Sequence, residues 1–495
     1  MGTTADRRPP GDCSRLRADQ HGTGGGPGRA VPTRCRAVLL PLRGLGHKRV
    51  KAPFANLYLS RLFYFQKLLK VKNMKSVITC DMEGRIETFS KGAEELFGYS
   101  AEEVVGKERV SVFSPGEIVL QNVPVWLDTA SREGKYEGET RFLRKDGSPF
   151  SARIRITPTF ANGKANGQTG YCGVTEAVAE EVDPPIRWTT KLVKALAITR
   201  MPFLSAVLMP AFIGGAFAYH YVLDNPGTAF SWGLFLWAVL GVALLHLGSN
   251  VMNDYFDVKD GTDGANNNYF LQFSGGSRAI ELGLITLGQT KKLGLLLLAA
   301  SGLIGAYLAW ATGWPALMIG LAGLAIGYLY TAPPVRLVAR RGLGELGIAL
   351  AFGPLVTLGI VYVATLQLVP MAFWIGLPAG LLTANILLIN EFPDAESDAL
   401  TGKNHLVVTF GKEKSTYIYL GILLAAAGLT LGLSFALPGG NLWLALVAVL
   451  ILASGLAIFR HIRMHYEDRS LVLSNKRTIA LSALGGLFTA IALIL

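Results

Sequence analysis

Asn-Asp-Tyr-Phe-Asp-Val-Lys-Asp-Gly-Thr-Asp, residues 253–263, stands where a long apolar segment of the chain ends. A second acidic cluster, Asn-Glu-Phe-Pro-Asp-Ala-Glu-Ser-Asp at residues 390–398, ends another apolar segment in the same way. Carboxylates are costly in a membrane, and groups of them at its edge usually mark a functional site. The two matching clusters therefore predict one site for a divalent metal and phosphate.

The composition is that of an integral membrane protein. Of the 495 residues, 51% are hydrophobic and only 17% are charged. From about Met201 onward the chain is a series of mostly uncharged stretches near the ~20 residues that a helix needs to cross a bilayer. The nine stretches are 202–222, 230–251, 292–311, 314–331, 346–366, 370–390, 415–437, 441–459 and 478–495. We therefore expect an all-α polytopic bundle of nine transmembrane helices over residues 199–495, embedded in the lipid bilayer.

The basic excess of the chain belongs to an N-terminal extension, residues 1–73. This segment holds 15 Lys and Arg but 3 Asp and Glu, so it accounts for the whole net charge of +12. The remainder is neutral, which argues against a nucleic-acid partner. The extension is rich in Arg, Gly and Pro, which disfavours a packed core. It is interpreted as a targeting peptide, a disordered tail, or translation from upstream of a true start at Met74.

Residues 74–178 form a soluble block with mixed strand and helix signals. The pattern predicts strands joined by an Asp-x-x-Gly turn over 77–86, a short helix with a Gly stop over 93–100, and an Asp-Gly hairpin over 139–150. This order of elements resembles a PAS domain, an α+β fold. The block has no histidine to hold a haem, and neither Cys80 nor Cys172 lies in a flavin-adduct motif. We therefore expect ligand-free interaction or a PAS-mediated dimer, followed by a linker over 179–198.

The charge of the loops predicts the orientation of the helices. With the N-terminus inside, the outer loops near 223–229, 312–313, 367–369 and 438–440 carry no Lys or Arg. The inner loops carry Lys259, Arg278, Lys291, Lys292, Arg336, Arg340, Arg341, Lys403, Lys412, Lys414, Arg460, Arg463, Arg469, Lys476 and Arg477. Under the positive-inside rule, both acidic clusters then lie on the cytoplasmic face, together with residues 74–178.

Helical spacing places the polar residues of each cluster on one face. Asn253 and Asp257 are one turn apart, and Asp260 follows a further turn on. Gly261 allows the chain to turn, so that Asp263 can reach back toward them. In the second cluster Asn390, Asp394 and Asp398 repeat every four residues, although Pro393 is expected to kink or restart that helix.

Facing stripes of this kind suit magnesium, which binds through a few carboxylates, retained waters and substrate phosphates. Basic residues on the same loops, Arg278, Arg336, Lys403 and Arg341, are candidates to clamp phosphate oxygens. The histidines near helix ends, His220 and His246, are expected to be interfacial or packing residues instead of ligands.

The clusters at 253–263 and 390–398 resemble the two aspartate-rich motifs of the UbiA superfamily of membrane prenyltransferases. The pattern at 253–263 is similar to the 1,4-dihydroxy-2-naphthoate branch, which makes menaquinone, as are Gly275-Gly276-Ser277-Arg278, Gly342-Leu343-Gly344-Glu345 with Phe352-Gly353-Pro354, and Asp398 with Gly402-Lys403. Two departures stand out. Glu391-Phe392-Pro393 replaces the Asn and Arg usual in naphthoate enzymes, and Asn404-His405 replaces a common Arg-Thr.

The resemblance implies Mg²⁺-dependent transfer of a prenyl group from a polyprenyl diphosphate to an aromatic acceptor. Asp254, Asp257, Asp394 and Asp398 would be the catalytic residues, and with Asp263 they would hold the metal; Asp260 is a further candidate ligand. Asn253 and Asn390 would position the diphosphate, and Tyr330, Asn385 and Arg336 are candidate acceptor contacts. The acceptor is expected to be 1,4-dihydroxy-2-naphthoate. The alternatives are another acceptor, namely 4-hydroxybenzoate, homogentisate or a lipid alcohol, and a membrane sensor in which the PAS domain is the functional part.

Overall fold

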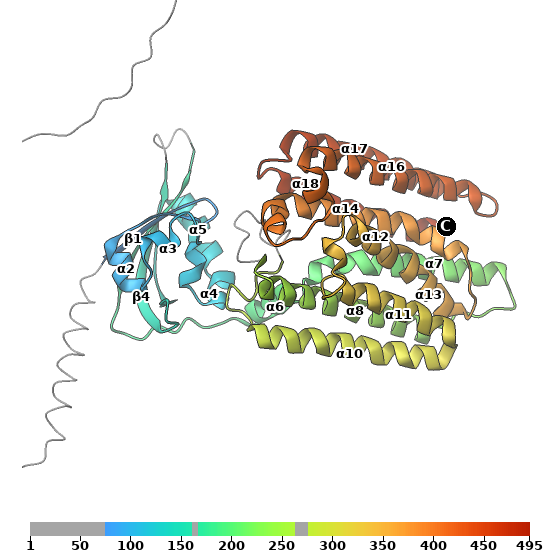
Figure 1. Ribbon diagram of the computed structural model, residues 1–495, viewed down its shortest axis with the longest axis horizontal. Helices are drawn as coiled ribbons and strands as arrows, with labels where there is room; N and C mark the ends of the chain where they lie inside the picture. Colours follow the sequence, from blue (N-terminus) through green and yellow to red (C-terminus); the bar gives the residue numbers. More distant parts are fainter. Residues whose placement is uncertain (1–74, 161–166, 263–275) are drawn as a thin grey trace, which may run out of the picture. The chain divides into compact units, whose positions relative to one another are not determined.

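The computed structural model describes residues 75–160, 167–262 and 276–495 (Figure 1). The predicted Asp263 ligand and the extension 1–73 lie outside the described residues. The chain comprises an N-terminal domain built on one β-sheet, followed by a series of helices that begins at Trp188.

The N-terminal domain is a five-stranded antiparallel sheet. The strands are β1 Lys75–Asp81, β2 Ile86–Phe89, β3 Tyr136–Leu143, β4 Pro149–Thr159 and β5 Gly170–Ala177, in the spatial order β2-β1-β5-β4-β3. Between β2 and β3 the chain forms α2 Lys91–Phe97, α3 Ala101–Val104, the 3₁₀ turn η1 Val110–Phe113, α4 Gly116–Gln121 and α5 Val123–Glu133. The short helices and the sheet enclose one hydrophobic core.

The turn residues confirm the sequence prediction for this domain. Gly84, Gly98 and Gly147 all adopt a positive φ of 79°, which glycine enters without a Cβ penalty. They close the β1–β2 turn, end α2 and form the β3–β4 turn, respectively. Their positions in the sequence were therefore sufficient to place these elements.

Aromatic rings fill the space between this sheet and its helices. Phe97 lies 4.4 Å from Phe113, 5.7 Å from Phe142 and 5.5 Å from Phe150 between ring centroids. Aromatic clusters of this kind contribute packing energy beyond their buried area. Burial raises the pKa of Cys80 to about 12, so its thiol stays protonated and unreactive at neutral pH. A dimer formed through this domain stays a prediction.

The second part of the chain is helical. Its helices are α6 Trp188–Ile198, η3 Met201–Leu204, α7 Ser205–Asp224, α8 Trp232–Lys259, α10 Leu287–Thr312, α11 Trp314–Leu329, η4 Leu337–Ala339, α12 Leu343–Leu350, the π-helical η5 Ala351–Leu355, α13 Val356–Thr365, α14 Met371–Leu400, α15 Leu406–Phe410, α16 Lys412–Ala436, α17 Leu442–His465 and α18 Leu471–Ala492. The long helices run side by side (Figure 1).

Seven helices of the described chain are long and apolar enough to cross a membrane. They are Met201–Asp224, Trp232–Lys259, Leu287–Thr312, Leu343–Thr365, Met371–Leu400, Lys412–Ala436 and Leu442–His465. Each of the nine predicted stretches is helical, but α11 is a shorter apolar helix and α18 does not meet both criteria. The bundle of membrane helices is thus confirmed, whereas the expected number of nine spans is not.

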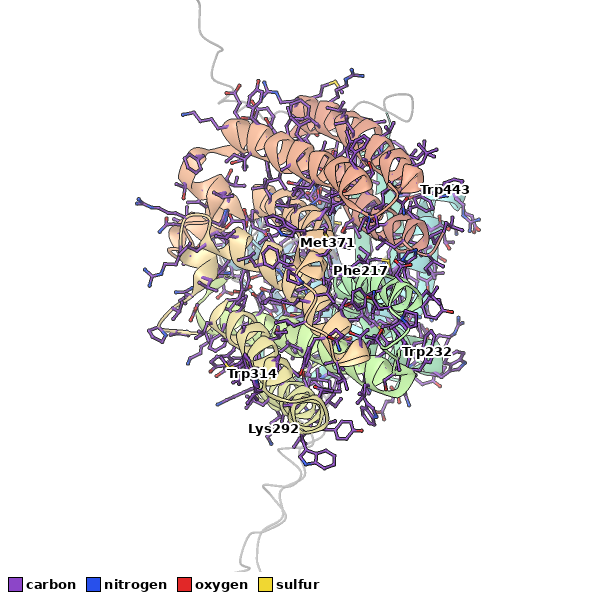
Figure 2. All side chains as sticks on the ribbon, turned by 90° about the vertical axis from the view of Figure 1, so that its right-hand side faces the viewer. Phe217, Trp232, Lys292, Trp314, Met371 and Trp443 are labelled. Carbon is purple, nitrogen blue, oxygen red and sulfur yellow. The ribbon has the colours of Figure 1, made fainter. Side chains whose placement is uncertain are left out.

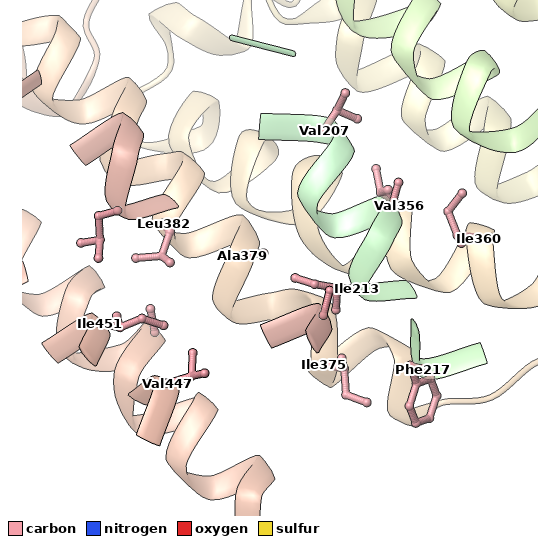
Figure 3. Packing of buried hydrophobic residues seen from close by; sticks show 14 of the residues in the cluster. Val207, Ile213, Phe217, Val356, Ile360, Ile375, Ala379, Leu382, Val447 and Ile451 are labelled. Carbon is pink, nitrogen blue, oxygen red and sulfur yellow. The ribbon is translucent and has the colours of Figure 1, made fainter. Parts of the chain in front are cut away.

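Helix α14 forms the centre of the bundle. Its apolar window is 72% buried, more than that of any other candidate span. Figure 3 shows Ile375, Ala379 and Leu382 of α14 between side chains of α7 and α13 on one side and of α17 on the other. The second acidic cluster is therefore carried by the most enclosed helix of the described chain.

The expected restart of α14 at Pro393 is wrong, because the helix is continuous from Met371 to Leu400. A proline lacks the N–H that would bond to the carbonyl four residues earlier, here that of Ile389. The side chain of Asn475 on α18 lies 3.4 Å from that carbonyl oxygen and donates to it instead. A neighbouring helix thus replaces the missing backbone donor, and the stripe of polar residues stays in register.

Exposed tryptophans mark one end of the bundle. Trp232 and Trp314 are the first residues of α8 and α11, and Trp443 lies at the start of α17 (Figure 2). Tryptophan is enriched where a membrane meets water. Because α8 starts at this end, the acidic cluster at its other terminus belongs to the opposite membrane face.

Close backbone packing around α14 gives a stability prediction. A Cβ added to Gly380 would collide with the Ala349 carbonyl oxygen, whereas one added to Gly432 of α16 would meet nothing within 4 Å. Overpacking costs typically about 1–3 kcal/mol. We expect Gly380→Ala to lower the Tm of the protein in detergent, and Gly432→Ala to leave it unchanged or raise it. Equal Tm values for the two variants would contradict this packing.

Candidate active site

The first acidic cluster occupies the last turns of α8. Asp254 and Asp257 are both buried, although each carries a carboxylate. The Nδ2 of Asn253 donates to Asp257 Oδ2 at 2.8 Å, and the backbone N–H of Ser277 donates to Asp254 Oδ1 at 3.2 Å. The expected pairing of Asn253 with Asp257 on one helical face is therefore present. Asp260 caps the helix and Gly261 then turns the chain with φ 78°.

The second cluster occupies the last turns of α14. Asn390, Asp394 and Asp398 all face one cavity, as their four-residue spacing predicts. Asp398 is buried, and Asp394 is half-buried. The three residues form one stripe because the helix is not interrupted at Pro393.

Lys403 joins the two clusters. Its Nζ lies 2.6 Å from Asp257 Oδ1 and 3.8 Å from Asp398 Oδ1, and the side chain is buried. Burying an ion pair is costly unless the partners are well placed, and removing one partner leaves the other charge uncompensated. The ammonium therefore couples the end of α8 to the loop that follows α14, and Asp257 and Lys403 are 146 residues apart in the chain.

Both stripes line a cavity of about 600 Å³. Its polar end is formed by Asn253, Asp257, Asn390, Glu391, Asp394, Asp398, Lys403 and His405. The rest of its lining is mostly apolar and comes mainly from α7, α8, α10, α11, α13 and α14, together with η5. A volume of this size fits an extended small molecule with a charged head and an apolar body.

Several predicted site residues lie elsewhere in the described structure. Asp254 is buried beside the site but is not part of the cavity lining, and Asp260 pairs with Arg336 at 3.0 Å. Arg278 is buried and its Nη1 lies 2.7 Å from Glu281 Oε1. Asn385 faces α16, where it donates to the Tyr419 carbonyl at 3.1 Å. Of the predicted acceptor contacts, only Tyr330 lines the cavity.

Other polar residues of the cavity were not predicted. His246 and Asn250 continue the stripe of α8 toward its start, and the Nε2 of His246 lies 3.1 Å from Asn250 Nδ2. His246 is buried against Phe352 and also lines the cavity. The spacing His246, Asn250, Asn253 and Asp257 keeps all four on one helical face. Continuing the Asn253–Asp257 stripe by two helical turns toward the start of α8 reaches both His246 and Asn250.

Arg200 also lines the cavity and adopts a positive φ of 52°. Its Nε lies 3.9 Å from Asp254 Oδ1. A non-glycine residue in this backbone region is strained and is often functional. Its position just before the first membrane helix gave no pattern in the sequence.

His405 contacts two carboxylates of the second cluster, those of Glu391 and Asp398. The Nε2 of His405 lies 3.1 Å from Asp398 Oδ2, and its Nδ1 lies 3.2 Å from Glu391 Oε2. Burial by itself would lower the pKa of His405, but the Glu391 and Asp398 carboxylates outweigh burial and raise it to about 10. The ring therefore faces one carboxylate with each of its nitrogens.

Asn475 of α18 orients Asn390. Its Nδ2 donates to Asn390 Oδ1 at 2.7 Å and faces the Ile389 carbonyl at 3.4 Å. Because a carbonyl oxygen only accepts, the Asn475 nitrogen must be the atom that faces it, and Asn390 must present its oxygen to Asn475. The NH₂ group of Asn390 is then left to face the cavity as a donor.

The chemistry of the donors at the polar end fits magnesium. Asn253, Asp257, Asp394 and Asp398 supply oxygen atoms from two helices to one cavity, and oxygen is the donor that magnesium prefers. Within residues 75–160, 167–262 and 276–495, however, no three acidic, His or Cys side chains are already gathered at metal-binding distance.

Comparison with known proteins agrees with these features. Residues 207–484 match the UbiA prenyltransferase family, and residues 74–173 match a PAS domain. The 1,4-dihydroxy-2-naphthoate octaprenyltransferase of Bacillus subtilis is 29% identical over 218 residues, which are 43% of this chain and 65% of that enzyme. The chain thus spans slightly less than two thirds of the Bacillus enzyme.

The enzyme of the same name from Haemophilus influenzae is 31% identical over 247 residues, which are 48% of this chain and 76% of that enzyme. Among solved structures, a UbiA homologue from Archaeoglobus fulgidus bound to GPP and Mg²⁺ is 21% identical, with a TM-score of 0.46. It covers 61% of this chain, and 99% of its own chain is matched. On the family match over more than half of its residues, this protein, with its N-terminal PAS domain, belongs to the UbiA prenyltransferase family.

Proposed function

We propose that this protein transfers a polyprenyl group from polyprenyl diphosphate to 1,4-dihydroxy-2-naphthoate, a step of menaquinone biosynthesis. The observation that carries the proposal is the convergence of two carboxylate stripes at the polar end of one otherwise apolar cavity. A diphosphate with a long isoprenoid tail has the same division into a charged head and an apolar body. The positive-inside distribution of loop charge supports a cytoplasmic position for the polar end.

The diphosphate would lie between the ends of α8 and α14. Lys403 offers an ammonium and Asn390 offers amide donors to its oxygens. Asn253, Asp257, Asp394 and Asp398 would hold magnesium, with Asp254 and Asp263 as further candidates. Bound Mg²⁺ would supply charge neutralisation to the leaving diphosphate. Donors fixed in place before the reaction stabilise this developing charge without further reorganisation.

The apolar part of the cavity would hold the isoprenoid chain. Glycines of two helices line it, namely Gly302 and Gly305 of α10 and Gly320 of α11, and a Cβ added at any of them would meet nothing within 4 Å. The absence of side chains at these positions leaves room for an apolar chain near the helix backbones. Binding of an isoprenoid against such a surface is favourable, because it removes apolar area from water.

The proposed acceptor follows the names of the relatives and the sequence pattern at 253–263. The alternative is another acceptor, namely 4-hydroxybenzoate, homogentisate or a lipid alcohol. It is favoured by Glu391 and His405, which replace residues usual in naphthoate enzymes and both line the cavity. Arg200, His246 and Tyr330 are the groups near which an electron-rich aromatic ring would lie. Such a ring attacks the allylic carbon as the bond to the diphosphate breaks.

We expect membranes containing this protein to prenylate dihydroxynaphthoate when it competes with hydroxybenzoate at equal concentration. Mass spectrometry of the quinone precursors measures both products in one reaction. Membranes without the protein provide the background. A predominant hydroxybenzoate product would reject the naphthoate acceptor but keep prenyl transfer.

Loss of either stripe is expected to abolish transfer. Asp257→Ala and Asp394→Ala each remove a carboxylate that faces the cavity, and we expect magnesium-dependent product to fall by at least 100-fold. Asp224→Ala is the matched control, because this exposed residue pairs with His220 at the end of α7. Near-normal product from either cavity variant at normal expression would reject the proposed site.

The orientation of Asn390 gives a third expected outcome. Asn475→Leu removes the donor that fixes Asn390. Asn390 would then lose its hydrogen bond to the charged diphosphate, which contributes about 1.5–3 kcal/mol, so we expect the KM for the prenyl diphosphate to rise by roughly 10–100-fold. Asn385→Leu removes an equally buried amide that faces α16, and its KM should stay unchanged. The same KM shift in both variants would show a general effect of packing.

A further inference from the structure

Glu391 is an unusual residue for the interior of this bundle. Its side chain is 6% exposed, and neither carboxylate oxygen makes a hydrogen bond of good geometry within the described part of the chain. Burying a carboxylate without a compensating partner is strongly unfavourable. Its charge is faced instead by the Nδ1 of His405 at 3.2 Å.

His405 is as deeply enclosed as Glu391, with a side chain only 1% exposed. Its ring bridges from Glu391 to Asp398, whose Oδ2 lies 3.1 Å from Nε2. Three consecutive contacts therefore connect Glu391, His405, Asp398 and Lys403, the last at 3.8 Å from Asp398 Oδ1. The histidine holds one oxygen of Asp398 while the lysine faces the other.

The loop that carries His405 is itself held in place. The backbone N–H of Lys403 donates to the Asp398 carbonyl at 2.9 Å, and that of Leu406 donates to Glu345 Oε1 at 2.7 Å. The Arg341 N–H donates to the Asn404 carbonyl at 2.8 Å. These hydrogen bonds hold the backbone before and after His405, and so fix the position of its imidazole.

We infer that His405 is a positioning residue, which fixes the carboxylate of Asp398 toward the cavity and is itself oriented by Glu391. The inference rests on the proposed function only for what Asp398 then binds. Groups behind metal-ligating residues commonly orient them, and their loss typically weakens metal binding 10–100-fold. Glu391 acts through His405, because its nearest contact in this group is with the ring.

A competing role for His405 is simple helix capping. Its Nδ1 also lies 3.4 Å from the backbone nitrogen of Val408, at the start of α15. Asparagine is a good N-cap residue, but it is too short to span from Glu391 to Asp398. His405→Asn therefore keeps the cap and removes the bridge, which separates the two roles.

The test is a titration of the full chain in detergent with Mg²⁺ alone, followed by thermal unfolding. We expect His405→Asn to raise the Mg²⁺ concentration for the half-maximal Tm shift by 10–100-fold, and Glu391→Gln to raise it by less. The double variant should match His405→Asn, because Glu391 has no effect without the ring. His220→Gln, which alters an exposed histidine–carboxylate pair, should behave as the wild type.

An unchanged Mg²⁺ midpoint in His405→Asn would overturn the inference, as would additive effects of the two substitutions. A wild-type protein without any Mg²⁺-dependent Tm shift would overturn it as well. Should His405→Asn fail to fold, an unchanged midpoint in Glu391→Gln has the same meaning. If the wild type forms no prenylated product but the His405-dependent midpoint persists, only the proposed function fails.

Discussion

The contact on which the site depends is the buried ion pair between Lys403 and Asp257. Its 2.6 Å separation joins the end of α8 to the loop that follows α14. Without a cation between them, the carboxylates of the two clusters would repel one another in a poorly solvated interior. The lysine and the imidazole of His405 together provide the positive charge that allows Asp257, Asp398 and Glu391 to be buried near one another.

Close backbone packing holds the first half of α14, which precedes the acidic cluster. Helix α14 contacts the π-helical segment Ala351–Leu355 through glycines, and Gly353, Gly376 and Gly380 leave no room for a Cβ. This contact keeps α14 enclosed by its neighbours, so that its polar stripe faces the cavity instead of lipid. The donor of Asn475 to Ile389 compensates Pro393 within the same helix. The glycine contacts and the Asn475 hydrogen bond thus together fix which face of α14 lines the cavity.

Much of the architecture followed from local signals. Uncharged stretches predicted the helices, and Gly84, Gly98 and Gly147 predicted the turns of the N-terminal domain, because positive φ favours glycine. The expected number of nine spans was not confirmed, because α11 is short and polar residues occur in α18. The helical period also placed Asn253 with Asp257 and Asn390 with Asp394 and Asp398. These features depend on residues close in the chain.

The sequence by itself therefore determined the class of the protein, the two acidic stripes and their family resemblance. Only the tertiary structure decided which other groups meet them: Lys403 between the clusters, His405 between Asp398 and Glu391, and Asn475 behind Asn390. It likewise placed Asn385 against α16, although its residue type fitted a substrate contact. The physical reason is that periodicity fixes the face of a helix on which a residue lies, whereas its partners depend on how helices distant in sequence pack together.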